Sequence, residues 1–68
     1  MEYSTTKTVT DWEFERIYNS DDVNIDTELQ WQFREDNPTY EVTGSIGHLQ
    51  DNGDNTKTYY ITFTYEIN

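Results

Sequence analysis

Alternation of apolar and polar residues along two segments is the feature that most constrains this chain. Between Val23 and Phe33 the odd positions are mainly apolar and the even positions hold Asn, Asp, Glu or Gln, and residues 59–67 alternate in a similar way. Side chains in a β-strand point alternately to opposite faces, so each segment predicts a strand with one apolar and one solvated face. We therefore expect strands at 23–34 and 57–67.

Turn-forming residues separate these two segments from a third predicted strand at 39–49. Pro38 presets a backbone dihedral in a tight reversal before this strand, and Asn52-Gly53 after it is a strong hairpin signal. Residues 23–67 therefore predict a three-stranded antiparallel meander.

Glycines interrupt the predicted strand at 39–49. The alternate positions from Tyr40 to His48 are expected to share one face, with a gap at Gly44. Glycine inside a strand usually marks a bulge, a bend or the close approach of another backbone. We therefore expect an irregularity in the strand near this position.

The last predicted hairpin has a local similarity to a known one. Residues 54–59, Asp-Asn-Thr-Lys-Thr-Tyr, resemble the second hairpin of the immunoglobulin-binding domains of streptococcal protein G. The resemblance covers only this turn and the start of the strand after it. It implies hairpin geometry there and implies nothing about antibody binding.

Residues 8–15 allow two interpretations. As a strand, Thr, Trp and Phe at the even positions alternate with Val and acidic residues at the odd positions, and Trp and Phe are enriched in strands. As a helix, Thr10 and Glu13 form a capping box, and Phe14 and Tyr18 have the spacing of one helical face. Residue propensities favour the strand.

The predicted fold is therefore mainly β, a small antiparallel four-stranded meander that forms a single domain over residues 1–68. The alternative is an α+β fold of order βαβββ, with a short helix at about residues 11–19. A sheet with one aromatic face must curl, be covered by a helix or pair with a second copy. We expect a homodimer, in which the core or the dimer interface is formed by Trp31, Phe33, Ile61 and Phe63.

The charge balance restricts the possible partners. Four Lys and Arg residues against fourteen Asp and Glu residues give a formal net charge of −10. Binding to nucleic acid through its phosphates requires Lys and Arg, so we expect no direct nucleic-acid contact and a basic protein partner. The chain has no apolar run of membrane-spanning length and no signal-peptide pattern at its N-terminus. We expect no membrane association and a cytoplasmic location, in the host cell if a phage encodes the protein.

No residue pattern indicates catalysis. The chain has no cysteine, and His48 is its only imidazole. The acidic segment 51–55 lacks the glutamate that completes a calcium-binding loop, and no nucleophile elbow or glycine-rich phosphate loop is present. We therefore expect no enzymatic activity, no cofactor and no metal.

The acidic residues follow the predicted strand alternation. Side chains at positions i and i+2 of a strand lie about 6.7 Å apart, which resembles the separation of neighbouring phosphates along a nucleic-acid backbone. Placing charges outward for solubility accounts for the same alternation. Tyrosine is common at the centres of protein interfaces. The predicted partner-binding residues are Asp11, Glu13, Glu15, Asp26, Glu28, Glu41 and Tyr60.

Two functions fit these expectations. The first is an acidic inhibitor or nucleic-acid mimic that blocks the basic groove of a nucleic-acid-binding protein or nuclease. In size and charge the chain resembles phage anti-defence proteins, including anti-CRISPRs and glycosylase inhibitors, and the immunity proteins of nuclease toxins. The alternative is a small structural or assembly module, such as a phage virion component, that oligomerises through its apolar sheet face.

Overall fold

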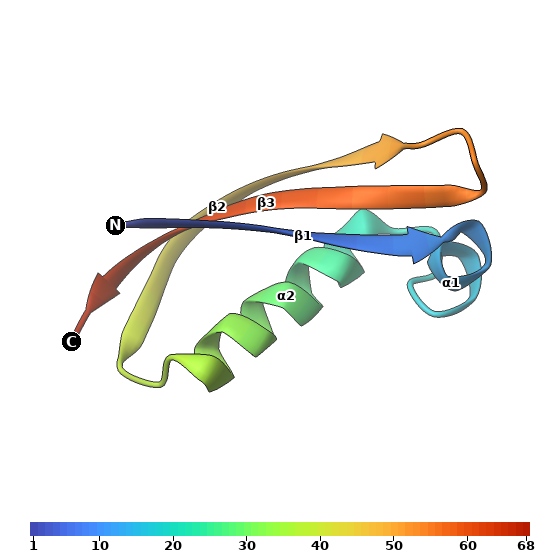
Figure 1. Ribbon diagram of the computed structural model, residues 1–68. Helices are drawn as coiled ribbons and strands as arrows, with labels where there is room; N and C mark the ends of the chain where they lie inside the picture. The colour runs from blue at the N-terminus through green and yellow to red at the C-terminus, as the bar shows by residue number, and fades with distance from the viewer.

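The computed structural model describes residues 1–68 as a three-stranded antiparallel sheet with two helices on one side (Figure 1). In chain order the elements are β1 (Glu2–Thr10), α1 (Asp11–Arg16), α2 (Asp22–Asp36), β2 (Tyr40–Asp51) and β3 (Thr56–Ile67). The strand order is β1-β3-β2, so the last strand in the chain is the central one. In Figure 1, α2 crosses the sheet diagonally and α1 lies at the end away from the two termini.

The predictions of a mainly β antiparallel fold and of strands at 39–49 and 57–67 are confirmed. The hairpin between β2 and β3 is present, and its loop holds Gly53 at φ 77° and Asn55 at φ 66°. These left-handed conformations suit glycine and asparagine, which explains the Asn- and Gly-rich loop sequence. The prediction of four strands is wrong, because the sheet has three.

The predicted strand at 23–34 is instead the long helix α2. Its buried side follows Ile25, Leu29 and Phe33, which are partly or fully buried and four residues apart. Positions four residues apart share a face in a strand and also in a helix, so the alternation fits both structures. Asp21 caps the helix by accepting a hydrogen bond from the Val23 N–H at 3.0 Å, and the segment includes Gln, Glu, Leu and Arg, which are good helix formers.

The core lies between α2 and the sheet. Its seven buried residues are Val9, Tyr18, Ile25, Phe33, Tyr59, Ile61 and Phe63. Phe33, Ile61 and Phe63 are therefore core residues, as predicted. Trp31 is not, because it lies on the opposite side of α2 from Phe33 and is 63% exposed.

The N-terminal segment combines parts of both interpretations. The strand β1 precedes position 11, and residues 11–16 form the short helix of the alternative fold. Its capping box is complete: the Glu13 N–H donates to the Thr10 hydroxyl at 3.0 Å, and the Thr10 N–H donates to the Glu13 carboxylate at 2.9 Å. These two bonds satisfy backbone donors that have no partner inside the helix, which favours helix formation at this point.

A bulge in β2 divides its side chains between the two sheet faces. The pairing of β2 with β3 shifts between Val42 and Gly44, which confirms the predicted irregularity. Before the bulge, Tyr40 and Val42 pack against the core. After it, Ile46 and His48 pair with residues of β3 that point away from α2, so the prediction that all these side chains share one face is wrong.

The aromatic sheet face is covered by α2 within the chain. The predicted homodimer rested on an uncovered aromatic face, so this reason for it no longer applies.

No helix in the structure has the length and apolar character needed to cross a membrane.

Candidate functional site

The acidic residues of α1 do not form the expected row of carboxylates. Asp11 accepts an ion-pair hydrogen bond from the Lys57 ammonium at 2.8 Å, and Glu13 caps the helix through Thr10. Glu15 is exposed and has no partner among the protein's hydrogen bonds and ion pairs. Of these three predicted partner-binding residues, one is therefore fully available to another molecule.

Asp26 points toward the sheet, where its carboxylate accepts a hydrogen bond from the Tyr59 hydroxyl at 2.8 Å. Burial is the main cause that raises the pKa of Tyr59 well above its usual range, and this hydrogen bond is the second cause. The tyrosine therefore stays protonated and keeps donating. Asp26 therefore connects α2 to β3 through a hydrogen bond. The prediction of a strand at 23–34 did not suggest this role.

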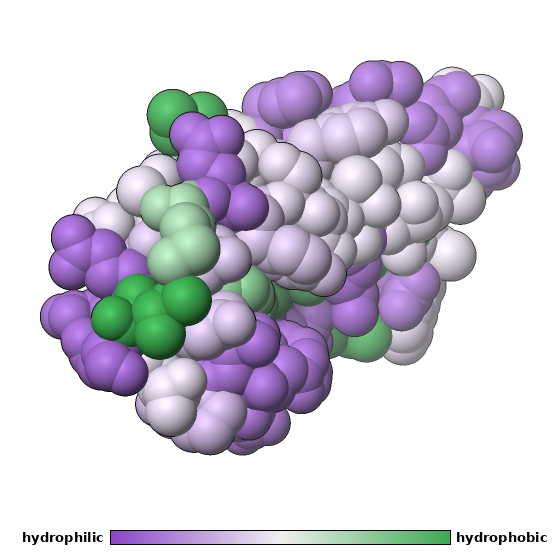
Figure 2. Space-filling model, turned by 60° about the vertical axis from the view of Figure 1, so that its left-hand side comes forward, coloured by the Kyte–Doolittle hydropathy of each residue, from purple (hydrophilic) through white to green (hydrophobic).

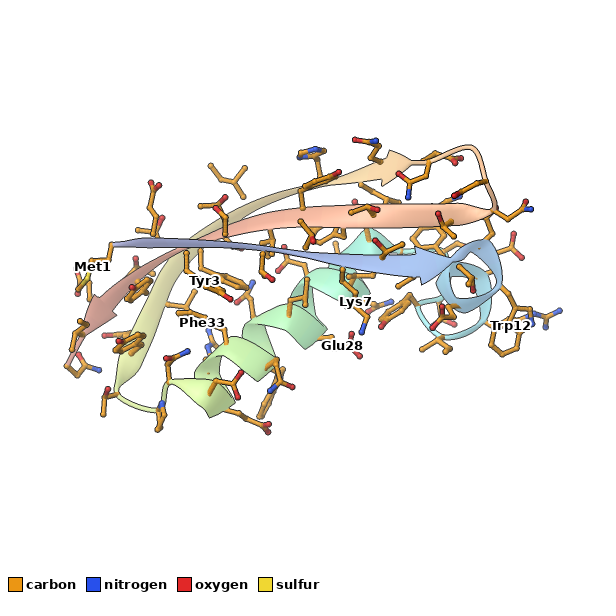
Figure 3. The ribbon with its side chains drawn as sticks, in the orientation of Figure 1. Met1, Tyr3, Lys7, Trp12, Glu28 and Phe33 are labelled. Atoms are coloured by element: carbon orange, nitrogen blue, oxygen red, sulfur yellow. The ribbon has the colours of Figure 1, made fainter.

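Glu28 joins three parts of the chain. Its Oε2 atom lies 3.1 Å from the Lys7 Nζ atom on β1 and accepts a hydrogen bond from the Tyr18 hydroxyl at 2.7 Å. Figure 3 shows Lys7 and Glu28 close to each other on the helical side of the sheet. The hydrogen bond from Tyr18 and the contact with Lys7 lower the pKa of Glu28, and the bond to Glu28 raises the pKa of Lys7.

The last two predicted residues lie on the other side of the sheet. Glu41 is exposed and pairs in register with Glu66 on β3. Tyr60 is partly buried, and its ring stacks on His48 with centroids 5.0 Å apart and planes 11° apart. The structure therefore does not bring the seven predicted residues together on one surface.

The surface that gathers charge is formed by residues 11–36, which we call the helical layer. This segment holds nine of the fourteen acidic residues, together with Arg16 and Arg34, so it accounts for −7 of the net charge. Within it, only Asp11 and Glu28 contact a lysine. The other carboxylates of this layer form no ion pair in the structure, and they are Glu13, Glu15, Asp21, Asp22, Asp26, Glu35 and Asp36.

Two exposed tryptophans accompany these carboxylates. Trp12 on α1 is 64% exposed and Trp31 on α2 is 63% exposed (Trp12 is labelled in Figure 3). Sequence reasoning missed this surface because it treated Trp31 as a core residue. A helical interpretation would have found it, since Val23, Thr27, Trp31 and Glu35 recur every four residues along the outer side of α2.

The opposite side of the molecule is the open sheet face, which no helix covers (Figure 1). It consists of the side chains of β1, β2 and β3 that point away from α2. Hydroxyl groups pair across its strands, with Ser4 and Thr62 at 2.8 Å and Thr8 and Thr58 at 3.0 Å. Its middle is uncharged, and Ile46 is 83% exposed there.

No protein-family model matches this chain, and no curated protein or solved structure matches it either. No three His, Asp or Glu side chains are grouped so that they could hold a metal ion.

Proposed function

We propose that this protein is an acidic inhibitor that binds the basic, nucleic-acid-binding surface of another protein through its helical layer. The observation that carries the proposal is the charge of residues 11–36, which is −7 and is compensated at only two carboxylates by lysine. A surface of this kind attracts a basic groove and competes with nucleic acid for it.

Charge and aromatic side chains would have different parts in binding. The carboxylates act over roughly a Debye length, about 8–10 Å at physiological salt, and speed the encounter with a basic partner. Trp12 and Trp31 supply apolar area at short range, and tryptophan is enriched among the residues that contribute most to binding. The mimicry proposed here is of a polyanionic surface, since the strand spacing first suggested for the carboxylates is absent.

A second candidate is an assembly module that uses the open sheet face. The exposed Ile46 and the uncharged middle of this face favour it, because the net charge of the chain opposes self-association least there. In that case a second copy or another sheet packs on the face opposite the helical layer.

The test compares two variants with the same change of net charge. Glu15→Lys with Glu35→Lys alters the helical layer, and Glu41→Lys with Glu66→Lys alters the opposite side of the sheet. None of the four carboxylates forms an ion pair or hydrogen bond in the protein, so the fold should survive both changes. Immobilised wild-type protein would capture partners from a lysate for identification, and duplex DNA would be added as a competitor.

We expect captured proteins to be basic nucleic-acid-binding proteins that DNA displaces. Their association rate should fall for the helical-layer variant more than for the sheet-face variant, and it should fall for the wild type as salt rises. Equal rates for the two variants would contradict the assignment to the helical layer. Concentration-dependent self-association that the sheet-face variant abolishes would favour the assembly module.

A further inference from the structure

A cleft opens on the helical side of the sheet, beside the second half of α2. Its volume is about 360 Å³, and ten residues of β1, α2, β2, β3 and the turn after α2 line it. Phe33 is part of its wall, and its ring centroid lies 5.3 Å from that of Tyr3 and 5.0 Å from that of Phe63. Figure 3 shows the Tyr3 and Phe33 side chains together between β1 and α2. We call this site the aromatic cleft.

Tyrosines form much of the wall. Tyr40 and Tyr65 stack on each other with centroids 4.8 Å apart, and both rings lie within 6.1 Å of Phe33. The hydroxyls of Tyr3, Tyr40 and Tyr65 form no hydrogen bond within the protein, unlike those of Tyr18 and Tyr59. Tyr3 is 49% exposed, so part of the cleft wall is in contact with solvent.

A carboxylate completes the lining. Asp36 lies at the cleft, and its Oδ1 atom accepts a hydrogen bond from the Gln32 amide at 3.1 Å. No cationic side chain forms an ion pair with it. None of the ten lining residues is Lys, Arg or His. Figure 2, which brings the end that carries the termini forward, shows hydrophobic side chains at this end of the molecule among paler and hydrophilic ones.

The aromatic rings and the carboxylate of the cleft favour a ligand that is a cation and also has a flat surface. The face of an aromatic ring carries negative potential and attracts cations within about 6 Å of its centroid. A guanidinium group stacks on aromatic rings, is weakly hydrated and donates hydrogen bonds in several directions. The unbonded tyrosine hydroxyls and the Asp36 carboxylate are acceptors for such donors.

We propose that the aromatic cleft binds an arginine side chain of a basic partner protein. This inference rests on the proposed function, since a nucleic-acid-binding surface supplies exposed arginines. The guanidinium lies against the exposed ring of Tyr3 and pairs with Asp36. The charge of the helical layer attracts the partner at long range. The cleft then binds one arginine side chain of the partner in the complex.

The test uses a matched pair of small probes. N-acetyl-arginine amide carries the guanidinium, and N-acetyl-citrulline amide has nearly the same shape without the charge. Each is titrated into 15N-labelled full-length protein at constant ionic strength, and amide chemical shifts are followed. We expect saturable shifts at Thr5, Gln32, Phe33, Asp36 and Asn37 with the arginine probe alone, and none at Thr62 on the open sheet face.

Two variants locate the binding energy. Tyr3→Leu keeps an apolar side chain but removes an aromatic face, and Asp36→Asn removes the charge. Each should weaken binding of the arginine probe by about two- to fivefold, the range expected for one exposed cation–π contact or one surface ion pair. Glu66→Gln, at an exposed carboxylate on the opposite side of the sheet, is the matched charge control and should leave the affinity unchanged.

The outcomes separate this inference from the proposed function. Equal shifts with both probes, or equal affinities in Asp36→Asn and Glu66→Gln, would contradict the arginine site while leaving capture of a basic partner intact. Saturable arginine binding that only the cleft variants weaken would support the site even if no nucleic-acid-binding partner were captured. Unchanged dispersion of the amide spectrum in Asp36→Asn keeps the test valid if Tyr3→Leu fails to fold.

Discussion

The helical layer and the open sheet face are two sides of the same thin molecule, and they differ in almost every surface property. The helical layer carries a net charge of −7 and two exposed tryptophans, and the aromatic cleft lies between it and the strands. The open sheet face pairs hydroxyl groups across its strands and is uncharged in the middle. The comparison shows that most of the net charge of this chain is concentrated in residues 11–36.

The two sides of α2 should differ most in stability. Phe33→Ala removes a buried ring that contacts four other aromatic rings, and we expect a loss of about 3–5 kcal/mol in the free energy of unfolding. Trp31→Ala, two residues earlier on the exposed side, should change it by less than about 1 kcal/mol. Urea denaturation monitored by circular dichroism measures both, and a larger loss for Trp31→Ala would contradict the helical placement of this segment.

Two glycines of β2 separate the core side from the open side in the same way. A Cβ atom at Gly47 would overlap the ring and hydroxyl of Tyr59, whereas a Cβ atom at Gly44 would meet no atom within 4 Å. We expect Gly47→Ala to cost about 1–3 kcal/mol and Gly44→Ala to change stability by about 0.5 kcal/mol or less. Thermal melting of the two variants distinguishes them, and equal melting temperatures would contradict the position of Tyr59 over Gly47.

The pH dependence of stability tests the contacts of Glu28. Because the folded protein holds the pKa of this carboxyl below its ordinary value of 4.5, its contribution is complete above that value and is lost as the pH falls through the folded pKa. Side chains exposed by 37% and 48% give the Lys7–Glu28 pair a small effect, about 1 kcal/mol or less. Denaturation at pH 3–7 should show a shallower acid loss for Glu28→Gln than for wild type. Identical slopes would contradict the assignment.

The smallest effect is expected on the open sheet face. Thr62→Val keeps a β-branched shape and removes the hydroxyl paired with Ser4, so the free energy of unfolding should change by about 0.5 kcal/mol or less. A loss above about 1.5 kcal/mol in the same denaturation experiment would show that the hydroxyl pairs stabilise the sheet. The open face would then be more than a solvated surface.

The sequence predicted the hairpin of β2 and β3 well and the helical layer poorly, for a physical reason. Residues 59–67 alternate, and the segment 57–67 is rich in Tyr, Ile, Phe and Thr, so pattern and propensity agree on a strand. In residues 23–34, Ile25, Leu29 and Phe33 satisfy a strand and a helix equally, and only propensity and the Asp21 cap distinguish them.

The predicted partner-binding residues depended on whether residues 23–34 form a strand or a helix. With 23–34 treated as a strand, Asp26 and Glu28 were expected on a solvated row, although in the helix they contact Tyr59 and Lys7. For Trp31 the difference is the opposite one, because a core position was expected and the side chain is exposed. Alternation alone could not assign these residues, because a period of two and a period near four coincide at every fourth position.

The central position of β3 has a consequence for how the protein folds. β1 and β2 do not pair with each other, and both depend on a strand that follows them in the chain, so Glu2 finds its partner only at Thr64. Pairing residues so distant in sequence requires closure of a long loop. The entropy cost of this closure comes before the strand contacts that offset it, which slows folding. During synthesis the first fifty residues should therefore remain without a sheet, with α2 as the only element of more than two turns able to form early.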